Sequence, residues 1–293
     1  MKEDLYLGVD GGGTTCRVRL YDAACRPLAQ GAAESASTRL GVEKAWNSIL
    51  EATRQALQEA GMTSADMRRI HAGMGLAGAA TEAERSGIAN HAHPFASVRV
   101  RTDAHAAVLG IFAGDDGGIL IVGTGSCGMA HVDGRFQTVG GWGFPVSDHA
   151  SGAWMGLRAI RESLLAHEGQ RESTALVEQI MARFGGEPGA ALVWQYSAQP
   201  RDYGTFVPLV FKAADAGDPL AQEIVATSGA EAARLLERLL QLGVTQLCLC
   251  GGLSRRTATL LPPRLQEKLV TPRGDAMDGG LFIALGKAGD STI

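Results

Sequence analysis

The residues with the clearest chemical potential in this 293-residue chain lie between Leu5 and Leu20. Two short apolar runs, Leu5–Val9 and Cys16–Leu20, read as strands, and the turn between them is rich in glycine and threonine. Successive glycines let a backbone approach a ligand closely, and their free N–H groups form an anion-binding concavity. We interpret the turn as a phosphate loop on a β-hairpin, and its residues are Gly11, Gly12, Gly13, Thr14 and Thr15. The alternative is an ordinary hairpin.

Three aspartates stand where strands or loops end, and carboxylates at such positions can hold cations or accept protons. Asp10 ends the first strand and could face a hydrated Mg²⁺, which keeps several waters and uses few carboxylates. Asp103 follows a predicted strand at Val98–Thr102, so it is a candidate general base; the alternative is an N-cap of the next helix. Asp148 follows the glycine-rich loop Gly140–Gly143 and is a candidate ligand contact, with helix capping again as the alternative.

The pattern of a strand, a turn rich in Gly and hydroxyl residues, and a second strand recurs roughly 110 residues later, which indicates two similar domains. A strand at Gly118–Val122 leads into a Gly/Thr/Ser turn at Gly123–Ser126 and a second strand at Cys127–Val132. Asp133–Gly134 is a strong type I′ hairpin signal, and a third strand follows at Arg135–Val139.

Two segments match the G-x-G-x-x-G dinucleotide fingerprint, and we weigh each by its context. The segment from Gly123 to Gly128 is followed by a strand, which does not fit. The segment from Gly73 to Gly78 follows a strand and precedes a helix, so a nicotinamide-dependent oxidoreductase is a less favoured alternative.

The remaining pattern is that of a mixed α/β chain. Further strands are expected at Pro27–Ala33, Arg69–Met74 and Gln246–Cys250. Helices are expected at Val42–Ala60, Glu82–His91, Ala104–Phe112, Ser151–His167, Ser173–Phe184, Val207–Ala216, Pro219–Leu242 and Met277–Gly286, the last opening at Asp275 or Asp278.

Composition excludes several classes of function. The chain is 45% hydrophobic and 20% charged with a net charge of −4, so nothing favours nucleic acid or an anionic membrane surface. No apolar run suits a membrane span, and the N-terminus leads straight into a strand, so we expect a cytoplasmic protein. The five cysteines lack paired metal-ligand spacing, and no histidine is assigned a role.

The order of these motifs resembles that of a known superfamily. DGGGTT, then GTGS, then CGGLS is similar to the phosphate-1, phosphate-2 and adenosine order of the actin, heat-shock chaperone and sugar kinase ATPases. Within that superfamily, GVDGGGTTCRVRL, GLAGA, TDAHAA, VGTGSCG and GGWGFPVSDHASG resemble the BadF/BadG/BcrA/BcrD ATPase family, and in particular its glucosamine and N-acetylglucosamine kinases.

The resemblance implies an α/β, two-lobed actin-like ATPase (ribonuclease H-like) fold with duplicated mixed β-sheets and a central cleft. Residues 1–112 would form the N-terminal lobe, to which a C-terminal helix at 277–288 returns, and residues 113–276 would form the second lobe. The expected activity is ATP-dependent phosphorylation of the 6-hydroxyl of glucosamine or N-acetylglucosamine. Alternatives are an activator-type or regulatory ATPase of the same fold, or the oxidoreductase named above.

The resemblance also implies a role for each motif residue. Asp103 would be the general base, and Asp10 would organise Mg²⁺ through water beside ATP. The phosphate and adenosine contacts would be Gly11, Gly12, Gly13, Thr14, Thr15, Thr124, Gly125, Gly251, Gly252 and Ser254. The sugar contacts would be Asp103, Ser126, Cys127, Gly141, Trp142, Gly143 and Asp148.

Two departures bear on the substrate. Cys127 stands where the animal N-acetylglucosamine kinases have Asn, and His149 follows Asp148 where they have Glu, so the preference at the sugar's C2 group is open. The expected partner is a small amino sugar, with neither nucleic acid nor membrane, and homodimerisation is left open.

Overall fold

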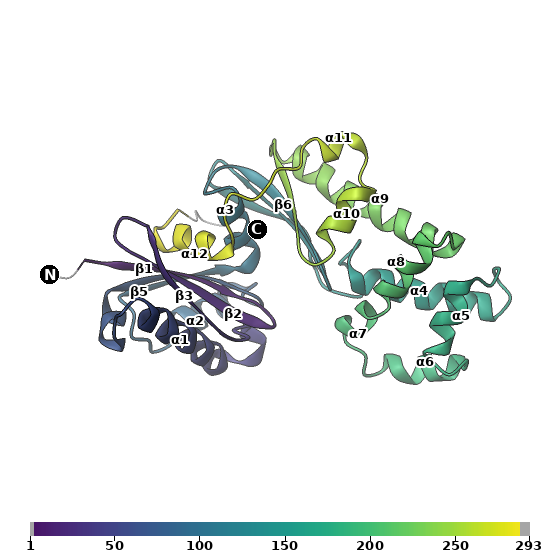
Figure 1. Ribbon diagram of the computed structural model, residues 1–293, viewed down its shortest axis with the longest axis horizontal. Helices are drawn as coiled ribbons and strands as arrows, with labels where there is room; N and C mark the ends of the chain where they lie inside the picture. The colour runs from purple at the N-terminus through teal and green to yellow at the C-terminus, as the bar shows by residue number, and fades with distance from the viewer. Residues whose placement is uncertain (1–2, 288–293) are drawn as a thin grey trace. The chain divides into compact units, whose positions relative to one another are not determined.

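The computed structural model describes residues 3–287, which form two β-sheets with helices packed around them (Figure 1). The strands are β1 Leu5–Gly11, β2 Thr15–Tyr21, β3 Pro27–Glu34, β4 Ile70–Leu76, β5 Ser97–Thr102, β6 Gly117–Val122, β7 Ser126–Val132, β8 Arg135–Gly140 and β9 Leu247–Cys250. The α-helices are α1 Val42–Glu59, α2 Glu82–Ala89, α3 Asp103–Ile111, α4 Gly152–His167, α5 Ala175–Ala182, α6 Pro188–Gln195, α7 Pro200–Gly204, α8 Val207–Asp215, α9 Pro219–Gln241, α10 Ser254–Leu260, α11 Pro263–Gln266 and α12 Ala276–Ala284. Two 3₁₀ helices, η1 Thr38–Leu40 and η2 Ser64–Arg69, complete the set. The predicted mixed α/β fold with two mixed sheets is confirmed.

The described residues divide into two compact units. The first comprises residues 3–117, 129–137 and 270–287, and the second comprises residues 118–128 and 138–269. The lobe limits given above, 1–112 with 277–288 and 113–276, stay a prediction. Their residues 1–2 and 288 lie outside the described part of the chain.

The five-stranded sheet of the first unit brings three strand ends together. Its order is β3-β2-β1-β4-β5, with β1 antiparallel to β2 and parallel to β4, which in turn is parallel to β5. Parallel neighbours end at the same edge of a sheet, and ligands of open α/β sheets bind outside that edge. Asp10 near the end of β1 and Asp103 directly after β5 therefore lie at one edge of this sheet.

Helices cover both faces of this sheet (Figure 1). Leu7 and Val9 of β1 are buried in one core with Trp46 and Ile49 of α1, which shows that alternate residues of the strand face this helix. Gly8 lies between them on the opposite face, where an added Cβ would come within 1.9 Å of the Met277 carbonyl oxygen. Glycine at this position thus lets α12 lie directly on the strand.

The same close packing explains the glycines that resembled a dinucleotide fingerprint. Gly73 and Gly75 lie inside β4 rather than in a loop after it. A Cβ on Gly73 would lie 2.0 Å from the Gly280 carbonyl oxygen of α12, and one on Gly75 would lie 2.3 Å from the Ala106 Cβ of α3. These glycines make room for helices, so the segment is not a dinucleotide-binding loop and gives the oxidoreductase alternative no support.

Charged residues fix the start of α12 against β2. Of the two aspartates predicted to open this helix, Asp275 is the N-cap, and its carboxylate accepts hydrogen bonds from the backbone N–H groups of Met277 and Asp278. The Arg19 guanidinium donates to Asp275 Oδ2 at 2.8 Å and to Asp278 Oδ1 at 2.6 Å. Two carboxylates and one partly buried guanidinium therefore hold a helix and a strand that are far apart in sequence.

The second sheet has the order β8-β7-β6-β9, with β6 parallel to β9. Asp133 and Gly134 join β7 to β8 with φ values of 50° and 73°, the left-handed pair that a type I′ turn requires. The helices of the second unit share a separate apolar core, which includes Ala153, Ile180 and Ile224. None of the helices within residues 3–287 has both the length and the apolar character needed to cross a membrane.

Candidate functional site

The glycine-rich turn between β1 and β2 is fixed by hydrogen bonds on its inner side, and its tip is exposed. The Gly12 N–H donates to the Thr15 carbonyl at 2.9 Å, and the Ser35 hydroxyl donates to the Gly12 carbonyl at 2.9 Å. A Cβ on Gly11 would lie 2.3 Å from Leu76 Cδ2, whereas one on Gly13 would meet nothing within 4 Å. Thr14 and Thr15 are exposed. This geometry fits an anion-binding loop, and that role stays a prediction.

Asp10 carries an ion pair beside this turn. It pairs across the strands with Arg17, whose Nη2 and Nε lie 2.5 and 3.2 Å from Asp10 Oδ2. Within residues 3–287 no group of three or more His, Cys, Asp or Glu side chains is arranged to hold a metal ion. A Mg²⁺ ion at Asp10 would accordingly keep several of its waters, which is the way this ion is usually bound beside phosphates.

Asp103 is the first residue of α3 and lies at the same sheet edge as Asp10. Its Oδ1 accepts a hydrogen bond from the Ala104 N–H at 2.9 Å. Burial raises the pKa of the Asp103 carboxyl, the Ala104 N–H opposes this rise, and the negative charge of Asp10 adds to it. A carboxylate that is costly to keep ionised has a higher proton affinity, which suits a general base.

The N-cap of α3 is Thr102, so the capping interpretation of Asp103 is wrong. The Thr102 side chain accepts from the His105 N–H, and its oxygen lies 2.7 Å from His105 Nδ1. Sequence reasoning gave no histidine a role and overlooked this contact. The available signal was the spacing of a capping threonine three residues before His105.

Arg39 is a second residue that sequence reasoning overlooked in this unit. It lies in η1, and its positive charge partly opposes the rise in the Asp103 pKa. The neighbouring Thr38 hydroxyl is buried without a hydrogen-bond partner and lies 2.5 Å from where a Cβ on Gly78 would stand.

In the second unit, the turn at Gly123–Ser126 is tied to the start of α4. The N–H groups of Gly152 and Ala153 donate to the carbonyls of Gly123 and Thr124 at 2.8 and 3.0 Å. The first N–H groups of a helix have no acceptor within the helix, and the carbonyls of this turn accept from two of those N–H groups. The turn is thereby fixed in place by the helix.

Asp148 joins this turn to the glycine-rich loop that precedes it. Its backbone is left-handed, with φ of 61°, and its Oδ1 accepts from the Gly143 N–H at 3.2 Å. Its Oδ2 would lie 2.6 Å from a Cβ on Gly125, so a side chain at that position would displace the Asp148 carboxylate. Ser151 is the N-cap of α4, and the capping interpretation of Asp148 is therefore wrong.

The other predicted sugar contacts of this unit lie around Asp148. The Ser126 hydroxyl is buried and donates to the His149 carbonyl at 2.6 Å, a contact that holds the segment in place. The Cys127 sulfur would lie 2.8 Å from a Cβ on Gly141, so thiol and loop are in close contact. Trp142 is 79% exposed.

The predicted adenosine motif follows β9. Gly251 has φ of 88°, and a Cβ there would lie 2.4 Å from the Val122 carbonyl oxygen at the end of β6. A Cβ on Gly252 would meet nothing within 4 Å, and Ser254 begins α10. The structure thus brings Gly251 against the strand that leads into the Thr124 turn.

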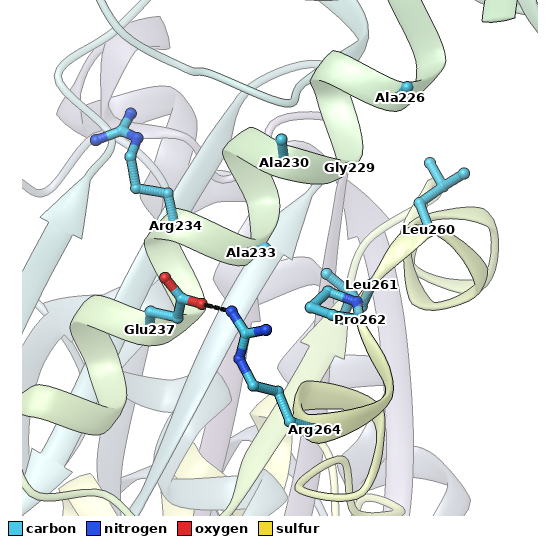
Figure 2. A pocket seen from close by; sticks show the side chains of 10 residues that line it. All are labelled: Ala226, Gly229, Ala230, Ala233, Arg234, Glu237, Leu260, Leu261, Pro262 and Arg264. Carbon is cyan, nitrogen blue, oxygen red and sulfur yellow. Dashed lines mark hydrogen bonds and ion pairs between the residues drawn. The ribbon is translucent and has the colours of Figure 1, made fainter.

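A groove of about 480 Å³ lies elsewhere in the second unit and contains none of the predicted site residues (Figure 2). Small residues of α9 line one side, and an ion pair between Arg264 and Glu237 crosses it. Its lining residues are Ala226, Gly229, Ala230, Ala233, Arg234, Glu237, Leu260, Leu261, Pro262 and Arg264.

Comparisons with known proteins agree with these motifs. The chain is 40% identical to a glucosamine kinase of Vibrio cholerae over 279 residues, which cover 95% of each chain. A solved structure from Chromobacterium violaceum, provisionally named an N-acetylglucosamine kinase, is 33% identical with a TM-score of 0.86 and covers 96% of this chain and 99% of that one. A glucokinase of the ROK family from Streptomyces griseus, 16% identical with a TM-score of 0.55, covers 96% of this chain and 98% of its own and shares the fold. The model of the BadF/BadG/BcrA/BcrD ATPase family matches residues 7–272, and the chain belongs to that family.

Proposed function

We propose that this protein is an ATP-dependent amino-sugar kinase that transfers phosphate to the 6-hydroxyl of glucosamine or N-acetylglucosamine. The observation that carries the proposal is Asp103, a partly buried carboxylate with a raised pKa, which lies at the same sheet edge as the glycine-rich turn. Similarity to an amino-sugar kinase along nearly the whole chain supports it. Such a carboxylate takes the proton of the attacking hydroxyl as the bond to phosphorus forms.

The first unit would hold the phosphates. The Gly12 N–H is already used by the Thr15 carbonyl, so the proposed donors to them are the Gly13 N–H and the hydroxyls of Thr14 and Thr15, with Gly11 and Gly12 shaping the turn. Asp10 would hold hydrated Mg²⁺, which neutralises charge on the transferred phosphoryl group when it is bound. Arg17 limits how far the Asp10 carboxylate can turn, because both of its donors bind Oδ2.

The second unit would supply the remaining contacts. Thr124 and Gly125 are proposed for phosphate, and Gly251, Gly252 and Ser254 for the adenosine. Asp148 is proposed to hold sugar hydroxyls, with Ser126, Cys127, Gly141, Trp142 and Gly143 around it. The support for Asp148 is its position, since it contacts Gly143 and covers Gly125 at once.

Glucosamine is the preferred substrate in this proposal. The acetamide of N-acetylglucosamine needs a strong hydrogen-bonding partner, and the Cys127 thiol is a weak donor and acceptor. Its sulfur also packs against Gly141. Trp142 could offer an apolar wall to an acetamide methyl, so the test is the ratio of kcat/KM for the two sugars. A tenfold ratio in favour of N-acetylglucosamine, about 1.4 kcal/mol, would reverse this preference.

ADP release in the presence and absence of sugar tests the activity itself. Purified protein with Mg²⁺ and ATP should release ADP quickly only when glucosamine is added, and 6-deoxyglucosamine should not replace it. Turnover that no amino sugar changes would instead indicate a regulatory or activator-type ATPase. We place the reaction in the cytoplasm, where ATP is available. Homodimerisation is a separate question, and light scattering on the same sample measures whether two copies associate.

A further inference from the structure

His105 lies one helical turn beyond Asp103 and contacts the N-cap of the same helix. It is buried, with 6% of its surface exposed, and its ring lies 4.7 Å from that of Phe136. Thr102 Oγ1 accepts from the His105 backbone N–H at 3.4 Å and lies 2.7 Å from Nδ1 of the same residue. Threonine and histidine thus enclose the first turn of α3, and Asp103 lies between them.

Either atom of the shorter contact can be the donor, because a hydroxyl carries one proton and two acceptor lone pairs. When the Thr102 oxygen accepts from the backbone N–H and its hydroxyl donates to Nδ1, the imidazole is neutral and carries its proton on Nε2, and this is the tautomer that we expect.

We infer that His105 is a positioning residue that holds the Thr102 hydroxyl through Nδ1 and thereby fixes the backbone from which the Asp103 carboxylate projects. This inference rests on the proposed function, because it gives Asp103 the role of general base. Loss of the contact frees the first turn of α3, and a general base displaced by a fraction of an ångström loses much of its effect.

Charge explains why a histidine suits this position better than the usual capping residue. In a capping box the third helical residue is normally Glu or Gln. A Glu at position 105 would place a second carboxylate beside Asp103, which already has Asp10 on one side. A neutral imidazole supplies an acceptor without negative charge.

The surrounding charges also favour the neutral imidazole. Burial is the main cause that lowers the pKa of His105 to about 4, and the positive charges of Arg101 on β5 and Arg85 on α2 contribute to the same shift. His105 therefore stays neutral throughout the pH range in which a kinase would be assayed.

Nitrogen NMR of ¹⁵N-histidine-labelled protein tests the tautomer without any activity. The His105 signals, assigned by their loss in His105→Asn, should show a protonated Nε2 and an unprotonated Nδ1 from pH 6 to 8. Thr102→Val should change the Nδ1 shift. A protonated Nδ1 in the wild-type protein would overturn the inference, whatever the protein catalyses.

Kinetics test the positioning role. His105→Ala and Thr102→Val should each lower kcat by 10-fold or more with KM for ATP within about 2-fold, and the double variant should be no slower than the slower single variant, because the pair acts as one unit. His105→Asn places an amide oxygen where Nδ1 stood and should recover most of kcat. The matched control is His131→Gln, which removes another buried imidazole from the same Phe136 ring and should keep kcat.

The outcomes separate the inference from the proposed function. Active wild-type protein whose His105→Ala variant keeps more than half of kcat would overturn the positioning role alone. Wild-type protein that is inactive with every amino sugar would overturn the proposed function, and with it the role of Asp103. If His105→Ala does not fold, the comparison of Thr102→Val and His105→Asn with wild type decides in its place.

Discussion

At the scale of single residues, two carboxylates at one sheet edge are the proposed reactive groups of the first unit. Asp10 forms an ion pair with Arg17, whereas Asp103 is partly buried and burial raises the pKa of its carboxyl. A raised pKa gives Asp103 the higher proton affinity that suits a base. The different surroundings of the two carboxylates fit the two different roles proposed for them.

Replacement of Asp103 by Asn should lower kcat by a factor on the order of 10²–10⁴, since the amide cannot accept the hydroxyl proton. The KM for ATP should change little, because Asn retains the size and the hydrogen bond to the Ala104 N–H. Steady-state kinetics with saturating glucosamine measure both values. An Asp103→Asn variant with half of the wild-type kcat would exclude the role of general base.

His105 should make the stability of the protein depend on acid. The unfolded chain binds a proton at this residue below its ordinary pKa of 6.5, and the native protein does so only near pH 4. Between these values the unfolded state binds more protons, so the free energy of unfolding falls as the pH falls, by about 1.4 kcal/mol per pH unit. The raised pKa of Asp103 acts in the opposite direction, but it is present in both proteins compared below.

Urea unfolding of wild type and His105→Asn at pH 7, 6, 5 and 4.5 isolates this contribution. The difference in unfolding free energy between the two proteins should be constant above pH 6.5 and should shift in favour of the variant below it. A difference that does not change with pH would show that His105 titrates normally.

Residue types alone predicted the candidate aspartates but not the contacts between Thr102 and His105. Asp103 stands at a strand end, which the sequence pattern reveals. The contact of a hydroxyl with one nitrogen of a buried ring depends on side-chain rotamers and on Phe136, which is distant in sequence. The effect of the Arg39 charge on the Asp103 pKa was also missed, because it depends on the spatial proximity of two residues that are far apart in sequence.

At the scale of elements, glycine controls how closely helices approach the first sheet. Gly8 and Gly73 lie on neighbouring parallel strands in register with each other, and both touch the backbone of α12. From the sequence, Gly73 matched a dinucleotide-binding fingerprint, because residue type alone cannot distinguish a glycine that makes room for a ligand from one that makes room for a helix.

The Gly73→Ala variant should lower the free energy of unfolding by about 2–4 kcal/mol, because its Cβ would overlap the Gly280 carbonyl oxygen and neither backbone can move far. Gly87→Ala is the matched control. This glycine is exposed within α2 with nothing within 4 Å, so alanine should stabilise the protein by about 0.5–1 kcal/mol. Urea unfolding measures the free energy of unfolding of both variants. Equal changes in Gly73→Ala and Gly87→Ala would refute the claim that Gly73 is needed for the close approach of α12.

Most element boundaries followed from apolar periodicity, and the short helices did not. The predicted helix at Val42–Ala60 and strand at Gly118–Val122 agree with α1 and β6 within one residue. Helices α6, α7, α10 and α11 were not predicted; α7, α10 and α11 have seven residues or fewer, which is too short for a periodic pattern to emerge.

At the scale of the whole molecule, the repeated strand–turn–strand pattern was the feature from which the architecture could be predicted. It indicated two sheets, and the structure has one of five strands and one of four. The number of helices in the second unit and the parallel pairing of β9 with β6 depend on contacts between distant segments, which one sequence does not reveal. Family membership then connects the motifs to a reaction class.

The position of the new phosphate in the product tests the central claim most directly. Purified protein, Mg²⁺, ATP and glucosamine should yield a product whose ³¹P signal couples to the two protons on C6, with one ADP formed for each phosphate transferred. The Asp103→Asn variant, treated in the same way, should form this product at least about 100-fold more slowly. Phosphate attached at C1, or release of inorganic phosphate with the sugar unchanged, would contradict the assignment as a 6-hydroxyl kinase.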